Sequence, residues 1–195
     1  MRVALCIGHS RPNDLGAVAA DGVTHEWTFW RYVAQKMRAE HPDSGHEIRI
    51  YDKYFGRSYT EAMSEIACRI RKDRCDVAIE LHFNAYNGEV QGAEAWAWKD
   101  STPGKRLAQS LLAAHVNSTR GAGGSFPLRG LKLADRQARG AQFLAKTHCP
   151  AVLWEPFFGD NPAEWEFYQP QEDLLSVVLS EALIDWEPYI LGGGL

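Results

Sequence analysis

Short apolar runs alternate along the chain with longer stretches in which apolar residues recur every three or four positions. The short runs predict strands, and the longer stretches predict amphipathic helices. Residues 77–81 are mostly apolar, which predicts a strand buried on both faces of a sheet. Residues 47–51 alternate between polar and apolar side chains, which favours a position nearer a sheet edge. The predicted strands are residues 2–7, 47–51, 77–81, 92–98, 143–145 and 151–154.

Helices are predicted between these strands, and two of them carry start signals. The first begins near Thr24 or His25 and ends at the turn-forming residues 42–45. The second opens with a capping box, in which the Ser58 hydroxyl accepts a backbone N–H and Glu61 reaches back to the cap. A third helix starts at residues 102–103 and a last one spans residues 171–186, whereas residues 118–130 are predicted to form a Gly-rich loop that runs into residues 128–132.

This order of elements defines a fold class. Strands that alternate with helices predict an α/β domain with a mixed, mostly parallel sheet of about six strands and helices on both faces. No linker or internal repeat divides the chain, so we expect a single domain over residues 1–190. The Gly-rich tail at residues 191–195 is expected to fray.

Composition and charge narrow the function classes. The chain has 195 residues and a formal net charge of −4, and no run of Lys or Arg suggests a nucleic acid partner. No apolar run is long enough to span a bilayer, so we expect no membrane insertion. We also expect the protein to be a monomer. The N-terminus turns polar too early for a signal peptide, which predicts a protein held in the cytoplasm until another factor releases it. Four cysteines without a CxxC pair favour core thiols, at Cys6, Cys68, Cys75 and Cys149.

Four residues combine catalytic side-chain types with strand or helix ends. His9 follows the first predicted strand, His82 ends the strand at 77–81, and Glu155 follows the strand at 151–154. In an open α/β sheet the carboxyl ends of the strands are where ligands bind. Glu26 stands at the start of the first helix, with His25 as a rival ligand beside it. Two imidazoles and one carboxylate form a known catalytic zinc set with a fourth position left open, but residues this far apart in sequence are a weak signal.

Five segments, in order, resemble the zinc-dependent N-acetylmuramoyl-L-alanine amidases that cut peptidoglycan. They are a strand ending in Gly-His, a glutamate at the start of the first helix, a strand ending in Ser-x-His-x-Asn-Ala, an Arg-Gly-x-Lys loop and a long motif containing a glutamate and Asn-Pro. The chain departs from the pattern where Glu80 replaces the small residue and where Ser10-Arg11 replaces the usual glycine pair. The matching segments are residues 7–9, 22–26, 80–85, 129–132 and 150–164.

The resemblance implies a function and a role for each matched residue. It implies Zn²⁺ on His9, Glu26 and His82, with Glu155 as the catalytic acid and base. It implies cleavage of the amide between N-acetylmuramic acid and L-alanine, and a lone catalytic domain without a signal would suit an endolysin. Asn84, Arg129 and Lys132 are candidate substrate contacts, although a solvated turn would explain the two basic residues equally well.

Two other functions stay open at this point. One is another zinc-dependent amidohydrolase or carboxypeptidase of related fold that acts on small peptides. The other is a glycan-binding module without catalysis, against which the presence of all four candidate residues argues.

Overall fold

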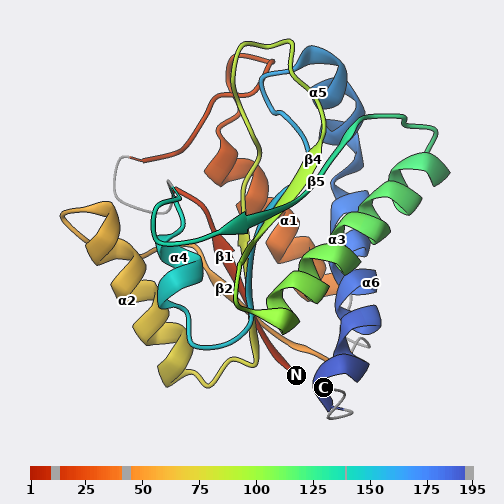
Figure 1. The fold of residues 1–195 in the computed structure, drawn as a ribbon. Coiled ribbons are helices and arrows are strands. Elements are labelled where there is room, and N and C mark those ends of the chain that lie inside the picture. The colour runs from red at the N-terminus through yellow and green to blue at the C-terminus, as the bar shows by residue number, and fades with distance from the viewer. Residues whose placement is uncertain (10–13, 41–44, 139, 192–195) are drawn as a thin grey trace.

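A six-stranded sheet forms the centre of the computed structural model, which describes residues 1–9, 14–40, 45–138 and 140–191 (Figure 1). The strand order is β2-β1-β3-β6-β4-β5. The neighbouring strands pair in parallel except β4 and β6, which are antiparallel. The mixed, mostly parallel sheet is therefore confirmed. The strands are β1 (Arg2–Ile7), β2 (Glu47–Tyr51), β3 (Val77–Leu81), β4 (Ala93–Trp98), β5 (Leu128–Ala134) and β6 (Ala151–Glu155).

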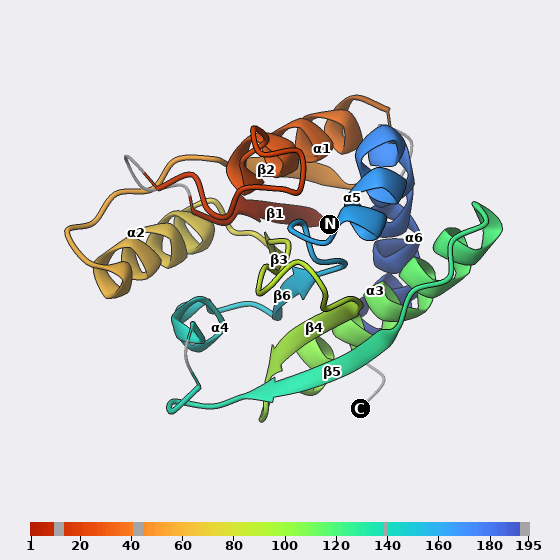
Figure 2. The same cartoon turned by 90° about the horizontal axis from the view of Figure 1, so that it is seen from above.

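Helices cover both faces of the sheet (Figure 2). Because side chains alternate along a strand, Val3, Leu5 and Ile7 of β1 face one core, while Ala4 and Cys6 face the other. Buried residues of α1, α3, α5 and α6 pack in the first core, and those of α2 and α4 pack in the second. The helices are α1 (Glu26–Glu40), α2 (Tyr59–Lys72), α3 (Thr102–Gly121), α4 (Gln142–Lys146), α5 (Pro162–Tyr168), the short 3-10 turn η2 (Gln169–Gln171) and α6 (Glu172–Leu191).

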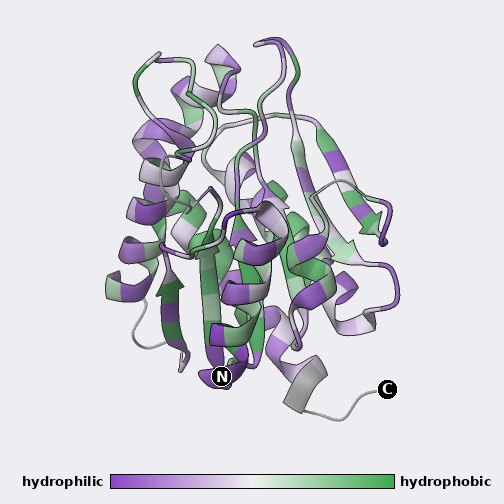
Figure 3. Ribbon diagram, turned by 90° about the vertical axis from the view of Figure 1, so that its left-hand side faces the viewer, coloured by the Kyte–Doolittle hydropathy of each residue, from purple (hydrophilic) through white to green (hydrophobic). Residues whose placement is uncertain are grey.

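The hydropathy pattern explains this layering. All five residues of β3 are buried, as the apolar run predicted, and β2 lies at the sheet edge, as its alternation predicted. Figure 3 shows hydrophobic strands at the centre, with hydrophilic residues on the outer faces of the helices. Among the described helices, none combines the length and apolar composition that crossing a bilayer requires.

Two predictions about secondary structure were wrong. Residues 143–145 lie in α4 and not in a strand, because Phe143 and Leu144 insert into the core beside α2 rather than into the sheet. Such a short apolar run suits either element. The sixth strand is β5, in the segment predicted as a loop. Its residues are mostly exposed or half-buried, so this edge strand lacks the apolar pattern that marks a buried one.

The predictions about where helices begin agree better with the structure, with two exceptions. Ser58 caps α2 by accepting from the Glu61 N–H, but the Glu61 carboxylate accepts from the Arg57 N–H instead of returning to Ser58. α5 was not predicted, although Asn161 caps it and Pro162 occupies its first turn. Three predictions fall on residues outside the described ones: most of the turn at 42–45 where the first helix should end, the Ser10-Arg11 departure, and residues 192–195 of the tail.

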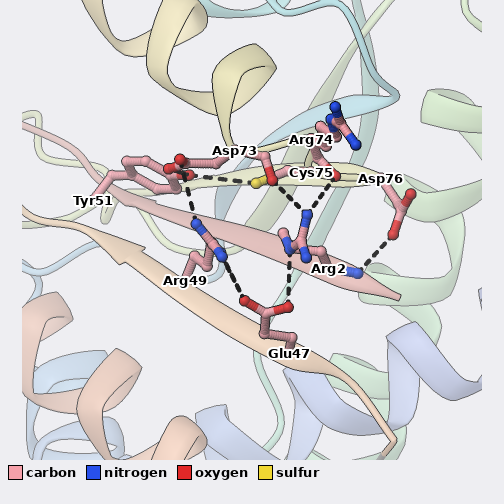
Figure 4. Close-up of polar contacts among 8 residues, drawn as sticks. All are labelled: Arg2, Glu47, Arg49, Tyr51, Asp73, Arg74, Cys75 and Asp76. Atoms are coloured by element: carbon pink, nitrogen blue, oxygen red, sulfur yellow. Dashed lines mark hydrogen bonds and ion pairs between the residues drawn. The ribbon is translucent and has the colours of Figure 1, made fainter.

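A polar network ties the start of β1 and β2 to the turn between α2 and β3 (Figure 4). The Arg2 side chain donates to Glu47 and to the Asp73 carbonyl, and the Arg2 N–H donates to Asp76. Arg49 also pairs with Glu47 and Asp73. The Tyr51 hydroxyl donates to Asp73 at 2.7 Å. Charged side chains on the edge strand β2 thus find partners within the chain, and charged residues are one of the means by which proteins protect a sheet edge.

Candidate metal centre and active-site cavity

Three neighbouring strands deliver the predicted residues to one edge of the sheet. β1 leads through Gly8 to His9, β3 leads directly to His82, and β6 ends at Glu155. Strand-like pairing continues past the strand ends, since the Gly8 N–H donates to the Leu81 carbonyl and the His82 N–H to the Trp154 carbonyl, each at 3.0 Å. His82 therefore lies between its neighbours at the carboxyl edge, as the sequence predicted.

His9, Glu26 and His82 converge there. Each offers one ligand atom, and these atoms lie within 4.8 Å of one another. The two imidazole rings meet edge to face, with centroids 5.2 Å apart. Among the described residues this is the only such group of potential metal ligands, and it excludes the rival His25.

Glu26 is held by both of its carboxylate oxygens. It is the first residue of α1 and only 2% exposed. Its Oε1 accepts from the Phe83 N–H at 3.2 Å and lies 2.8 Å from His82 Nδ1, while its Oε2 accepts from the Ala17 N–H at 3.2 Å. These two backbone donors fix the orientation of the buried carboxylate at the N-terminus of α1.

The loop after β1 places His9. The backbone of His9 has a φ of 58°, in the left-handed region, and this turns the chain away from β1. Its Nδ1 lies 2.8 Å from Asp14 Oδ1, and its Nε2 lies 3.5 Å from Glu26 Oε2. A carboxylate on one ring nitrogen fixes the tautomer and leaves the other nitrogen for a metal.

Gly8 sets the position of the His82 ring. A Cβ on Gly8 would lie 2.2 Å from His82 Cε1 and 2.5 Å from Nδ1, so only glycine lets the ring pack against β1. Burial disfavours a charged His82, but the neighbouring carboxylates of Glu26 and Glu80 outweigh it and raise the pKa of the ring well above its ordinary value. Two carboxylates thus attract a cation to this place.

These donors fit a zinc ion. Zinc is bound by neutral imidazole nitrogens and ionised carboxylates in tetrahedral geometry, and catalytic zinc sites keep one position open. Two imidazoles and one carboxylate at mutual distances below 5 Å supply three ligands. Loss of a proton from His82 would accompany metal binding.

Glu155 lines the cavity of about 590 Å³ that opens beside His9 and His82. Burial raises its pKa to about 8, with Glu26, Glu94 and Glu80 adding to the rise and His82 opposing it. Its Oε2 is buried and has no hydrogen-bond partner among the described residues. A carboxyl group with a pKa near neutrality can both accept and donate a proton. The walls of the cavity also include Tyr54, Tyr59, Met63, Trp96, Ala134 and Leu144.

Arg129, one of the predicted substrate contacts, pairs with a carboxylate of the site. Glu94 of β4 stands directly opposite Glu155 of β6, and Arg129 Nε donates to Glu94 at 2.7 Å. Although burial opposes it, hydrogen bonds from Arg129 and Trp96 hold the pKa of Glu94 below its usual value. The pairing of β4 with β5 skips Arg129, a β-bulge that aims this side chain at Glu94.

The other two predicted substrate contacts, Asn84 and Lys132, differ in their position relative to the cavity. Asn84 lines the cavity, and its backbone pairs with Phe157 and Gly159 in the loop after β6. Lys132 pairs in register with Trp96, which lines the cavity, but Lys132 itself does not line it. The Asn84 side chain also faces Glu94 and helps to lower the pKa of that carboxyl group.

The sequence interpretation missed three acidic residues of the site. Asp14, Glu80 and Glu94 all line the cavity. Glu80 could have been recognised as a charge inside a run buried on both faces, and Glu94 as a charge at the start of an apolar strand. Asp14 had no comparable signal, because an aspartate in a Gly-rich loop ordinarily forms a turn.

Comparisons with known proteins agree with this architecture. A family model described as N-acetylmuramoyl-L-alanine amidase matches residues 3–180. The catalytic domain of the CD27L endolysin that targets Clostridia difficile has a TM-score of 0.76 at 21% identity, over 95% of this chain and 97% of that one. The CwlD amidase of Clostridioides difficile, solved with the GerS lipoprotein, has a TM-score of 0.77 at 20% identity, over 98% of each chain. The CwlV catalytic domain from Bacillus (Paenibacillus) polymyxa has a TM-score of 0.71 at 18% identity, over 98% of this chain and 99% of that one. No curated protein sequence matches the chain.

Proposed function

This chain belongs to the N-acetylmuramoyl-L-alanine amidase family, and we propose that it hydrolyses peptidoglycan with a zinc ion held by His9, Glu26 and His82. The bond cleaved is the amide between the lactyl group of N-acetylmuramic acid and L-alanine. Glu155 is the acid and base of this reaction. The observation that carries the proposal is the convergence of three ligand atoms within 4.8 Å at one end of the cavity that Glu155 lines.

A bound zinc ion would lower the pKa of water and polarise the scissile carbonyl. The chain's own residues supply the rest. Glu155 Oε2, which has no hydrogen-bond partner among the described residues, accepts the proton of the attacking water. It then passes this proton to the leaving amine of L-alanine. A pKa near 8 in the metal-free protein falls when a cation binds nearby, which favours the base form at the start of the reaction.

The substrate contacts form a second part of the proposal. Asn84 is placed to hydrogen-bond the substrate from the cavity wall. Arg129 contributes through Glu94, whose charge it offsets, and its half-exposed guanidinium keeps donors for a substrate carboxylate. Lys132, on the edge strand β5, would contact the stem peptide further from the scissile bond.

Digestion of purified sacculi tests the proposal. The protein is incubated with sacculi, with a chelator and with a chelator followed by added zinc, and the products are read by mass spectrometry. New L-alanine amino termini and intact glycan strands, lost with chelator and restored by zinc, are expected. Intact muramoyl–alanine bonds would overturn the proposal. Cleavage of small peptides alone would then favour a carboxypeptidase-like hydrolase, and metal-free retention on sacculi a glycan-binding module.

The biological setting we propose is cell lysis by a monomer. The fold resemblance to an endolysin catalytic domain supports this role, in which the protein stays in the cytoplasm until it is released. Cells that make the protein should stay intact until a pore-forming protein is co-expressed, and should then lyse. Lysis without the pore-forming protein would contradict cytoplasmic retention.

A further inference from the structure

Glu80 is a buried carboxylate that stands two residues before His82. It belongs to β3, is only 2% exposed and lines the active-site cavity. Because side chains alternate along a strand, Glu80 and His82 point to the same face of the sheet. A carboxylate at this depth needs a partner, since the burial of an unpaired charge costs several kcal/mol.

The partner of Glu80 is the ring of His82. Its Oε2 lies 3.6 Å from His82 Nε2, and no Lys or Arg among the described residues pairs with it. The same Oε2 has no shorter hydrogen bond in the described part of the chain. On β1, the residue in register with Glu80 is the buried Cys6, which adds no charge to compensate the carboxylate.

His82 is therefore held on three sides. Nδ1 faces Glu26 Oε1 at 2.8 Å, Nε2 faces Glu80, and the ring packs on Gly8. Of its two nitrogens, Nδ1 is the one directed at another member of the ligand group. Nε2 is thus the nitrogen left to donate a proton.

His9 has the same arrangement with the nitrogens exchanged. Its Nε2 faces Glu26 Oε2 at 3.5 Å, and its Nδ1 faces Asp14 at 2.8 Å. Each histidine thus directs one nitrogen to Glu26 and the other to a carboxylate outside the ligand group. Histidines that bind metals usually donate their second N–H to such an outer carboxylate.

Building on the proposed function, we propose that Glu80 is a positioning residue that accepts a hydrogen bond from His82 Nε2 and thereby presents Nδ1 to the metal. Glu80 is not a ligand itself. The 3.6 Å separation shortens when the ring settles on a metal, as long active-site hydrogen bonds often tighten in the functional complex. Glu80 does for His82 what Asp14 does for His9.

Zinc affinity, measured by competition with a chromogenic chelator, tests this role apart from activity. Glu80→Ala is expected to weaken zinc binding about 10- to 100-fold, the usual effect of losing such a partner. Glu80→Gln keeps an oxygen that can accept from Nε2, so it should restore the affinity to within about threefold of wild type. Glu94→Ala is the matched control, because it removes a carboxylate from the same cavity without touching His82, and its effect should stay within about threefold.

The pattern of results separates this proposal from the one on which it rests. His82→Ala defines the loss of a true ligand. If Glu80→Gln binds zinc as weakly as His82→Ala, Glu80 is a ligand and the positioning role is wrong. If Glu80→Ala binds like wild type while His82→Ala does not, the inference alone fails. Absence of zinc binding by the wild-type protein would overturn both proposals.

A spectroscopic measurement on the wild-type protein keeps the test independent of how Glu80→Ala folds. With ¹¹³Cd as the metal and ¹⁵N-labelled histidine, the scalar coupling reports which ring nitrogen binds. Coupling of ¹¹³Cd to Nδ1 of His82 and a protonated Nε2 are expected. Coupling to Nε2 would place the metal on the side of Glu80 and refute the proposal.

Discussion

Two polar clusters of this protein lie on the same sheet and differ in how their charges are satisfied. In the network around Arg2 and Arg49, each carboxylate has a cationic, hydroxyl or backbone N–H partner (Figure 4). Glu80, Glu94 and Glu155 line the cavity, and Glu26 lies near enough to act on Glu155. Within the described part of the chain, only Glu94 of these four pairs with an arginine. Burial, together with neighbouring carboxylates, raises the pKa of Glu155 to about 8, whereas a hydrogen bond from Tyr51 lowers the pKa of Asp73.

This difference distinguishes charges that support the stability of the fold from charges that serve the function of the site. Paired charges lower the free energy of the folded chain or leave it unchanged, and they hold strands in place. Unpaired buried carboxylates raise that free energy, and they persist where a cation or a proton transfer uses them. Changes in the cavity should therefore affect metal binding and turnover more than stability, and changes in the network the reverse.

Glu155→Gln gives the largest expected effect. Loss of a general acid and base costs about 10²- to 10⁴-fold in rate, measured as release of L-alanine amino termini from sacculi. Zinc content should stay at the wild-type level, because Glu155 is not among the three ligands. The free energy of unfolding in urea should be unchanged or higher, since a neutral amide replaces a crowded carboxylate. A variant that loses its zinc or keeps full activity would show that Glu155 has another role.

Gly8→Ala should damage the site through geometry alone. The new Cβ would lie 2.2 Å from His82 Cε1, so the ring must move off its position against β1. We expect zinc affinity and activity to fall by about 10- to 100-fold and stability by about 1–3 kcal/mol. Gly121→Ala is the matched control, because nothing lies within 4 Å of its Cβ. Equal effects of the two substitutions would contradict the contact with His82.

The convergence of the candidate metal ligands was predictable, and the reason is topological. His9 and His82 each follow an apolar strand, and parallel strands bring their carboxyl ends to one edge. Glu26 required more than this rule, because helix-start glutamates are common, and the family resemblance selected it over His25. The order of elements likewise predicted a mixed sheet, but not which edge strand would complete it.

Other parts of the site depend on contacts that a sequence does not display. The bulge at Arg129 follows from the pairing of β4 and β5, and neither the bulge nor the contact between Arg129 and Glu94 leaves a local pattern in the sequence. The helix at Gln142–Lys146 replaced a predicted strand because Phe143 and Leu144 fit a gap beside α2. Glu80 did leave a signal, because it is a charged residue within a run predicted to be buried. The resemblance to a family pattern with a small residue at this position drew attention away from that signal.

The core beneath the sheet offers a third kind of polar group, which should make stability depend on pH. His115 is buried between Trp154 and Tyr168, and burial lowers its pKa from 6.5 to about 4. Because the unfolded chain binds this proton more tightly, stability is full above pH 6.5 and decreases as the pH falls toward 4. The loss is at most about 3 kcal/mol.

Urea unfolding of the metal-free protein at several pH values measures this dependence. His115→Gln removes the titrating ring and keeps an atom that can bond the Tyr168 hydroxyl, so the decline between pH 6.5 and 4 should become shallower. An identical decline in wild type and variant would assign it to other groups. Zinc-free protein is needed because protonation of the metal ligands would otherwise contribute.

Tyr51→Phe gives the smallest expected effect and returns to the paired network. The substitution removes a hydroxyl that donates to Asp73 and lies 3.4 Å from the Cys75 thiol. Loss of this hydrogen bond should cost about 1 kcal/mol in the free energy of unfolding. Zinc affinity and amidase activity should match the wild type, because the network has no contact with His9, Glu26 or His82 among the described residues. A change in zinc affinity without a change in stability would mean that the two clusters are coupled through β1, and the separation between scaffold and site would not hold.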